Sequence, residues 1–193
     1  MEAPTVVSTS RSRSAPYWLY AFLFAAVLLA TIRLHHGASS SGIQPAATRK
    51  PAELGRLHLL DNTTWTIPGH RGEVILINYW ATWCAPCQEE LPALLHTAQQ
   101  FSPQGLAMLG ISLDLGPDAD TRVRNYVAQN HIPYPIASAA GQWTAGTDLM
   151  ALPTTLLIDR QGRVAAAFEG PLQPSQLDRS IKLLLAEPAP RLP

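Results

Sequence analysis

A short apolar run from Val74 to Asn78 is followed directly by a segment whose apolar residues recur at helical spacing. Strands buried on both faces of a sheet read as continuous apolar runs of this kind. The following segment places apolar side chains at i, i+3, i+4 and i+7, on one helix face: Leu91, Leu94, Leu95 and Ala98. We therefore predict a buried strand that packs under a helix running from about Cys84 to Phe101.

The alternation of strand and helix patterns continues toward the C-terminus. Leu106 to Leu113 is predicted as a second buried strand, and Asp118 to Asn130 as a helix with an acidic first turn. Thr154 to Ile158 and Arg163 to Phe168 flank a turn that contains Gly162, which predicts an antiparallel hairpin.

A last helix completes the pattern. Ser175 to Asp178 resembles a capping box that would open it, with Leu177, Ile181 and Leu184 facing inward. Upstream, Leu57 to Trp65 has the pattern of a weak strand or hairpin. A βαβ half followed by a ββα half around one mixed sheet is an α/β layered domain, and this is the fold class we predict.

The N-terminal part carries a different pattern. Residues 14–32 contain no charged side chain, and as a helix they would span roughly 28 Å, close to the ~30 Å hydrocarbon core of a bilayer. A cleaved signal peptide is the alternative, but its apolar core is usually shorter and small residues follow it, whereas His35 and His36 lie here. We expect an uncleaved transmembrane signal anchor.

Charges beside the run favour one orientation. Two arginines precede it and one follows, so the positive-inside tendency favours a cytoplasmic N-terminus, residues 1–13. We then expect a flexible linker at residues 33–53, rich in Ser, Gly, Pro and Ala, a folded domain at 54–187 and a tail at 188–193. The protein would pass once through the inner (cytoplasmic) membrane, with its domain on the periplasmic or another extracytoplasmic side.

The chain has two cysteines, Cys84 and Cys87, so no further cysteine is available for a separate structural disulfide. In the first turn of the predicted helix their sulfurs are close enough to bond, and the positive end of the helix dipole favours the thiolate form of the first. A thiolate is the nucleophile of disulfide exchange. We expect Cys84 to attack a substrate disulfide, and Cys87 to attack the Cys84 sulfur and release the reduced substrate.

Other uses of the pair remain as alternatives. A chance pair, a permanent disulfide and half of a zinc site are all open, although a disulfide that closes so short a loop restrains the unfolded chain little. A zinc site normally needs four ligands, and dispersed histidines alone could complete it: His58, His70, His96 and His131. We favour redox activity and expect no metal and no cofactor. Net charge is zero without a basic stripe, so we expect no nucleic acid partner.

Two segments resemble a known family. Residues 78–87 (NYWATWCAPC) resemble the thioredoxin active-site segment, and residues 151–159 (ALPTTLLID) resemble its second signature. The resemblance covers about Leu54 to Glu187, and with the N-terminal anchor it is closest to the membrane-anchored TlpA-like, ResA-like and DsbE-like branch of the thioredoxin superfamily. It implies a thioredoxin fold and a protein disulfide oxidoreductase, often a reductant in cytochrome c maturation or related thiol delivery. The implied partners are protein thiols and disulfides and a membrane thiol-electron donor.

The resemblance also implies roles for individual residues. Cys84 is the nucleophile and Cys87 the resolving thiol, while Trp83 shields the site. Pro153 would be a cis-proline that presents the backbone of Leu152 to an extended substrate segment. Substrate contacts are therefore expected at Trp83, Pro86, Leu152 and Pro153.

Asn78 departs from thioredoxin itself, which has at the matching place a buried aspartate that takes the proton of the resolving thiol. An asparagine cannot take a proton. In the anchored branch a glutamate three residues after the second cysteine assists proton transfer, and Glu90 matches it. At i, i+3 on a helix Glu90 and Cys87 share a face. The alternative for Glu90 is a solvated surface carboxylate, which is the sole interpretation for Glu89.

Two further functions compete with disulfide exchange. A copper-delivery protein would use the same cysteines as soft Cu(I) ligands, but that function usually wants wider cysteine spacing and a dedicated histidine. A thioredoxin-fold peroxidase would need a lone peroxidatic cysteine with a threonine and an arginine nearby. We therefore predict a thiol–disulfide oxidoreductase, with a Cu(I)-binding delivery protein as the alternative.

Overall fold

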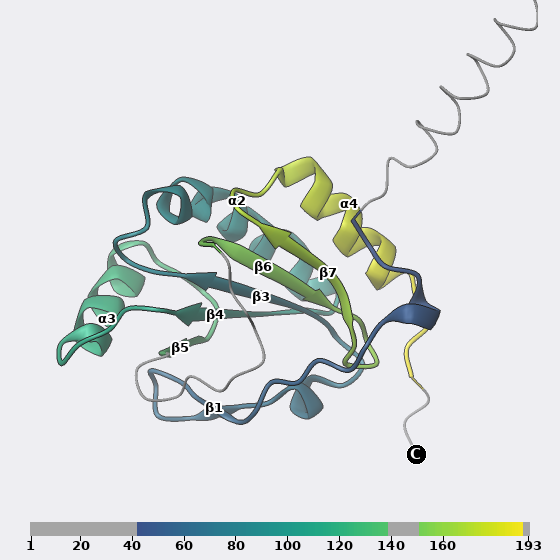
Figure 1. The fold of residues 1–193 in the computed structure, drawn as a ribbon, viewed down its shortest axis with the longest axis horizontal. Helices are drawn as coiled ribbons and strands as arrows, with labels where there is room; N and C mark the ends of the chain where they lie inside the picture. Colours follow the sequence, from purple (N-terminus) through teal and green to yellow (C-terminus); the bar gives the residue numbers. More distant parts are fainter. Residues whose placement is uncertain (1–41, 139–150, 191–193) are drawn as a thin grey trace, which may run out of the picture. The chain divides into compact units, whose positions relative to one another are not determined.

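The computed structural model describes residues 42–138 and 151–190 of the chain (Figure 1). Within these ranges a mixed sheet is built from β3 (Val74–Trp80), β4 (Leu106–Ser112), β5 (Ile136–Ser138), β6 (Thr154–Ile158) and β7 (Val164–Glu169). The strand order is β5-β4-β3-β6-β7. β4 runs parallel to β3 and to β5, whereas β6 is antiparallel to β3 and to β7.

Helices and a small hairpin flank this sheet. The helices are α2 (Ala85–Phe101), α3 (Ala119–Gln129) and α4 (Pro174–Leu185), and the hairpin pairs β1 (Leu57–His58) with β2 (Thr64–Trp65). Short 3₁₀ turns are η1 (Ala46–Thr48), η2 (Ile67–His70) and η3 (Ser102–Gln104). The α/β class and the strand and helix positions predicted from the sequence are confirmed.

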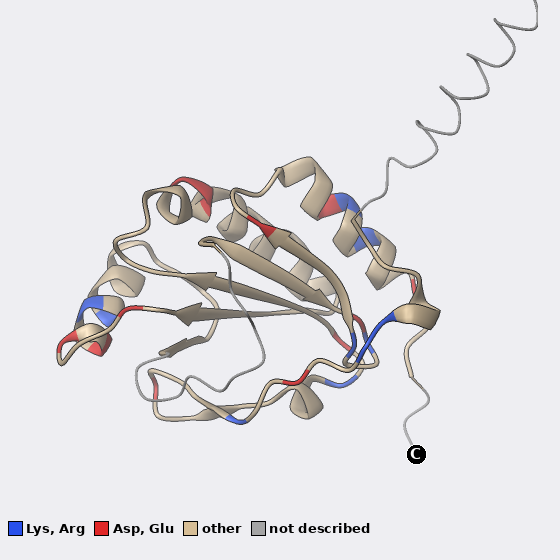
Figure 2. Ribbon diagram, viewed as in Figure 1, with Lys and Arg blue, Asp and Glu red and all other residues tan. Residues whose placement is uncertain are grey.

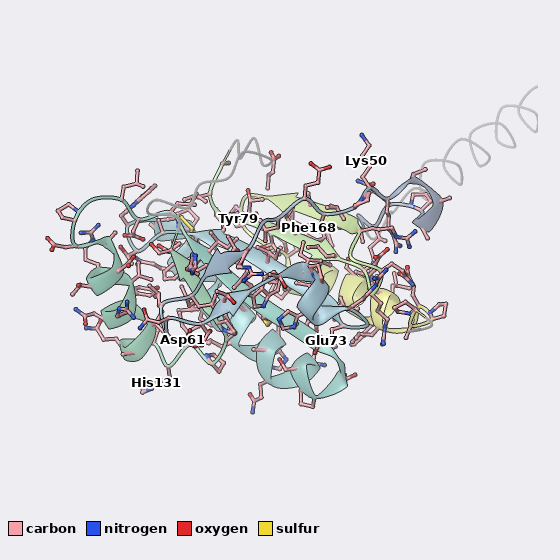
Figure 3. All side chains as sticks on the ribbon, turned by 90° about the horizontal axis from the view of Figure 1, so that it is seen from below. Lys50, Asp61, Glu73, Tyr79, His131 and Phe168 are labelled. Carbon is pink, nitrogen blue, oxygen red and sulfur yellow. A yellow bond between two sulfur atoms is a disulfide. The ribbon has the colours of Figure 1, made fainter. Side chains whose placement is uncertain are left out.

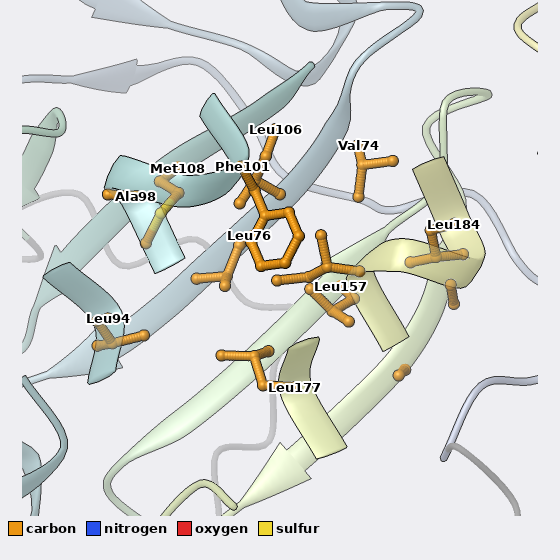
Figure 4. Close-up of a cluster of buried hydrophobic side chains, with 13 residues drawn as sticks. Val74, Leu76, Leu94, Ala98, Phe101, Leu106, Met108, Leu157, Leu177 and Leu184 are labelled. Carbon is orange, nitrogen blue, oxygen red and sulfur yellow. The ribbon is translucent and has the colours of Figure 1, made fainter. Parts of the chain in front are cut away.

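One face of the sheet packs against α2 and α4. Val74 and Leu76 of β3 point to this face, and α2 and α4 contribute a cluster of buried side chains to it (Figure 4). The helix residues in the cluster are Leu94, Ala98, Phe101, Leu177, Ile181 and Leu184. Burying a leucine fully is worth about 1.5–3 kcal/mol, so this interface holds the two helices to the sheet.

The opposite face is covered by the N-terminal part of the domain. Ile75, Ile77 and Tyr79 alternate with the residues above and point to this face. They pack in one cluster with side chains of the β1–β2 hairpin and of η2. Both faces of β3 are therefore buried, as its continuous apolar sequence predicts.

One strand was not predicted, and one local prediction is wrong. β5 was not predicted, because three residues are too few to show a period, and its partner Gly110–Ser112 is what defines it. The predicted capping box at Ser175 is wrong, since α4 begins at Pro174 after Gln173 and has no side-chain cap hydrogen bond. A proline in the first turn suits a helix start because its missing N–H would have no partner there.

The chain upstream of residue 54 also differs from the prediction. From Gly42 on, the segment expected to be a flexible linker is bonded to the domain. The N–H of Gln44 donates to the carbonyl of Ala165 at 2.8 Å, and the N–H of Val164 donates to the carbonyl of Lys50 at 2.9 Å. The predicted boundary at residue 54 is therefore too late, because pairing with β7 leaves no mark in the composition of the segment.

A buried arginine fixes this segment further. The side chain of Arg49 is 3% exposed and its Nη1 lies 3.0 Å from Oδ2 of Asp159, while Nη2 lies 2.7 Å from Oε1 of Glu187. Asp159 also pairs with Arg163, so opposite charges meet at this end of the sheet (Figure 2). The neighbouring Lys50 points away from the domain (Figure 3). Burial by itself would raise the pKa of Asp159, but hydrogen bonds from Arg163 and Arg49 outweigh it and hold the pKa below its ordinary value.

The predicted membrane span at residues 14–32 and the N-terminus before it lie outside the described residues. Among the residues that the structure does describe, no helix is long and apolar enough to cross a membrane.

Replacing Arg49 by alanine should lower the free energy of unfolding by about 2–4 kcal/mol, because Asp159 stays buried with one cation fewer. Chemical denaturation checks this, and Lys50→Ala, an exposed neighbour, should change stability by less than about 0.5 kcal/mol. Since the pKa of Asp159 is lowered, its stabilising effect is present above about pH 3.9 and lost as pH falls through the folded-state value. The gap between wild type and Arg49→Ala should therefore narrow in acid, and equal stabilities at pH 7 would contradict the prediction.

Candidate active site

The two cysteines lie where β3 gives way to α2. Cys84 is the N-cap residue of α2, and its Sγ accepts a hydrogen bond from the N–H of Cys87 at 3.3 Å. The pair forms a disulfide with the Cα atoms 5.3 Å apart. Pro86 fits in the first turn, where a missing N–H costs nothing. The site therefore has its sulfurs at the positive end of a helix of 17 residues.

The disulfide is largely covered by neighbouring side chains. Cys84 and Cys87 are each 5% exposed, and they belong to a buried cluster with Trp80, Ala81 and residues of α3 and β5. Trp83, by contrast, is 67% exposed. The cover of the sulfurs in the structure thus comes from this cluster, and the Trp83 ring is presented mainly to solvent.

The start of β6 lies beside the disulfide. The peptide bond between Leu152 and Pro153 is cis, as the resemblance implies. Leu152 packs against the cluster that contains both cysteines. The carbonyl of Pro153 accepts from the N–H of Gly170 at 2.8 Å, and Thr154 Oγ1 donates to the carbonyl of Ala151 at 2.7 Å. These bonds position the segment next to the sulfurs.

Glu90 is buried in the second turn of α2, so the surface-carboxylate alternative is wrong. It is 6% exposed, and its Oε1 accepts from Nδ2 of Asn78 at 2.8 Å. Its Oε2 accepts from the N–H of Leu172 at 3.3 Å. Burial raises the pKa of Glu90, and the hydrogen bonds from Asn78 and Leu172 oppose that shift without cancelling it. Glu89 is exposed, as expected.

Asn78 therefore holds the carboxyl group of Glu90 in place. Its Nδ2 also lies 3.0 Å from Oγ1 of Thr155 in β6, so it joins β3, α2 and β6. This contact was not predicted, although an asparagine in a buried strand does signal that a polar partner must exist.

A second buried carboxylate, Asp114, was also missed. It follows β4, is 0% exposed, and its two oxygens accept from the N–H of Thr82 at 2.8 Å and from Thr82 Oγ1 at 2.5 Å. Ser112 Oγ donates to it at 2.9 Å. The loop before Cys84 is thus tied to the loop after β4.

The histidines considered as ligands are dispersed. In the described part of the chain, no three His, Cys, Asp or Glu side chains are grouped closely enough to hold a metal ion.

Comparisons with known proteins agree with this geometry. Residues 50–167 match the model of the AhpC/TSA family. The chain is 31% identical over 113 residues to the thiol-disulfide oxidoreductase ResA of Bacillus thuringiensis (strain Al Hakam), an alignment that covers 58% of this chain and 64% of the relative. It is 31% identical over 117 residues to the thiol:disulfide interchange protein HelX of Rhodobacter capsulatus, covering 60% of this chain and 62% of that protein.

A crystal structure shares the fold. The thiol:disulfide interchange protein of the thioredoxin family from Chlorobium tepidum TLS superposes with a TM-score of 0.61 at 25% identity, over 74% of this chain and 100% of that one. The curated relatives, in contrast, are matched over less than two thirds of their own length. The mixed sheet with its flanking helices is therefore a thioredoxin fold, and the chain is similar to ResA. It belongs to the AhpC/TSA family.

Proposed function

We propose that the protein is a protein thiol–disulfide oxidoreductase. The observation that carries this proposal is the Cys84–Cys87 disulfide in the first turn of α2, because a thiolate formed there faces the helix N-terminus. The names of ResA and HelX support the same activity. A peroxidase is disfavoured because the chain has no lone cysteine, both being in one disulfide.

The reaction uses both sulfurs in turn. In the reduced protein the Cys84 thiolate attacks one sulfur of a substrate disulfide, and the other substrate sulfur leaves as a thiolate. Cys87 then attacks the Cys84 sulfur of the mixed disulfide, and the second substrate sulfur leaves. Two electrons have passed to the substrate, and the protein holds the disulfide found in the structure.

Cys87 must lose its proton before it attacks, and we assign Glu90 as the acceptor. A base works best when its pKa lies near the operating pH, and burial moves the pKa of Glu90 in that direction. The amide of Asn78 holds one carboxylate oxygen and the N–H of Leu172 holds the other. Neither the amide of Asn78 nor the N–H of Leu172 can accept a proton, so the proton taken from Cys87 stays on the carboxyl group of Glu90.

The substrate is proposed to bind around the disulfide. Leu152, presented by the cis-proline Pro153, offers its backbone for pairing with an extended segment on one side. Pro86 is half-buried in the turn between the cysteines, and the exposed ring of Trp83 lies directly before Cys84.

We further propose that residues 14–32 anchor the protein in the inner membrane, with the domain on the extracytoplasmic side. The uncharged composition of this run supports the anchor. The resemblance to the anchored branch supports a reductive role, with cytochrome c maturation as the candidate process and a membrane thiol protein as the electron donor.

Cys84→Ala should abolish reduction of a protein disulfide, because the remaining Cys87 has no second thiol with which to complete the exchange. Cys87→Ala should instead accumulate the mixed disulfide with substrate, since the attack that releases it is missing. Turnover and intact-mass measurements on the two variants check this. Retained turnover in Cys84→Ala would contradict the mechanism, and circular dichroism confirms that each variant is folded.

The same pair sets the direction of electron flow. Equilibration of the wild type with a glutathione or dithiothreitol couple gives its reduction potential. A potential near that of strong oxidants, about −120 mV, would contradict the reductive role.

Glu90→Gln should slow release of reduced substrate from a preformed mixed disulfide by about 10²-fold, because the proton acceptor is lost. In the wild type this step should speed up as pH rises through the pKa of Glu90, which burial places above the ordinary value of about 4.3. In Glu90→Gln the rate of this step should not show that rise with pH. Single-turnover kinetics across pH checks this.

A matched control is Glu89→Gln, which changes an exposed neighbour and should leave the profile unchanged. A second readout follows from linkage. Because the pKa of Glu90 is raised in the folded protein, protonated Glu90 contributes fully to the free energy of unfolding below about pH 4.3. This contribution is lost as pH rises through the folded-state pKa. Glu90→Gln should not show that loss. An identical rate profile in wild type and Glu90→Gln would refute the assignment.

The full chain should remain with membranes after an alkaline wash, because residues 14–32 are apolar. The double substitution Leu23→Arg and Leu28→Arg should move it to the soluble fraction, as each central arginine costs about 2.5–3.5 kcal/mol of insertion free energy. The control carries isoleucine at both positions. Recovery of the unaltered chain in the soluble fraction would contradict the anchor.

A further inference from the structure

Two surface loops are bonded to each other beside the disulfide. The first is the loop before Cys84, and the second is the loop that follows β4. Asp114 of the second loop accepts from the N–H of Thr82 at 2.8 Å and from its hydroxyl at 2.5 Å. Because Asp114 is completely buried, these bonds are protected from competition by water.

Each loop carries a large apolar side chain immediately after the bonded residue. Trp83 follows Thr82 and is 67% exposed, and Leu115 follows Asp114 and is 72% exposed. In the described part of the chain, the other large apolar side chain with comparable exposure is Leu183 of α4, at 48%. One exposed leucine needs no explanation, but two large apolar side chains on tied loops beside a reactive bond do.

The position of Leu115 is fixed from a third element. Arg122 of α3 donates from Nη2 to the carbonyl of Leu115 at 2.8 Å, and its Nε lies 3.8 Å from Oδ1 of Asp114. The loop after β4 is therefore fixed at Asp114 by Thr82 and at the carbonyl of Leu115 by Arg122. Leu115 is presented to solvent by an ordered backbone, and such preorganisation reduces the entropy cost of binding.

We propose that Trp83 and Leu115 form a docking surface for an apolar side chain of the polypeptide whose disulfide is attacked by Cys84. This inference rests on the proposed function. Trp83 directly precedes Cys84, so a substrate sulfur bonded to Cys84 lies next to this surface. An extended chain advances about 3.3 Å per residue, which brings the side chains one to three residues from the substrate cysteine within reach.

This surface differs from the backbone platform at Leu152, because it comes from the loop before Cys84 and the loop after β4 and binds side chains. It therefore selects substrates by sequence, whereas backbone pairing accepts most sequences. The partner that fits is an unfolded or extended segment with a large apolar residue close to its cysteine.

The test compares two synthetic peptides that differ at one residue, leucine or serine, two positions from a cysteine held in a mixed disulfide with glutathione. The reduced wild-type protein should attack the leucine peptide faster. Leu115→Ser should cut the rate with the leucine peptide by roughly three- to tenfold and leave the serine peptide and oxidised glutathione unchanged. Stopped-flow fluorescence or quenched mass analysis gives the rates.

Leu183→Ser is the matched control, because it removes an exposed leucine from α4 and should keep the preference for the leucine peptide. An unchanged preference in Leu115→Ser would overturn the docking surface, and so would an equal loss with both peptides and glutathione. The proposed function fails separately, if the wild type exchanges with none of the three disulfides.

Discussion

The active site depends on the burial of β3 on both of its faces. All seven residues of this strand are buried, and α2 begins at Ala85, shortly after the strand ends at Trp80. Alternate side chains of the strand bind α2 and α4 on one side and the N-terminal hairpin on the other. Asn78 lies near the end of the strand that leads into the disulfide, so the packing that stabilises the domain also aims its amide at Glu90.

Three buried carboxylates are accommodated in three different ways. Asp159 is balanced by Arg49 and Arg163, and its pKa is lowered. Asp114 is bonded mainly to backbone and hydroxyl donors and ties two loops. Glu90 accepts from an amide and a backbone N–H, and no cation pairs with it among the described residues, so burial dominates and its pKa is raised. A buried carboxylate with a lowered pKa stays ionised and stabilises the fold through its ion pairs. A buried carboxylate with a raised pKa can take up and release a proton closer to neutral pH.

The sequence predicted the elements better than the contacts between them. Period and composition locate β3, α2 and the β6–β7 hairpin because each leaves a pattern within a few neighbouring residues. The partners of Arg49 and Asp114 lie far away in sequence, at Asp159 and Thr82, and no local pattern reports them. The same holds for Asn78: its type signalled a polar partner, but the identity of that partner came from the packing of α2. The cysteine pair was found at once because both members fall in one turn.

The pairing of residues 44–50 with β7 has a consequence for self-association. β7 is an outer strand of the sheet, and backbone bonds from Gln44 and Lys50 occupy part of its free side. At the other outer strand, β5, the N–H of Leu60 donates to the carbonyl of Ile136. Open strand edges invite a second molecule to extend the sheet, which leads to aggregation. By bonding its own chain to both outer strands, the protein covers backbone groups of β5 and β7 that would otherwise be open to pairing with a second molecule.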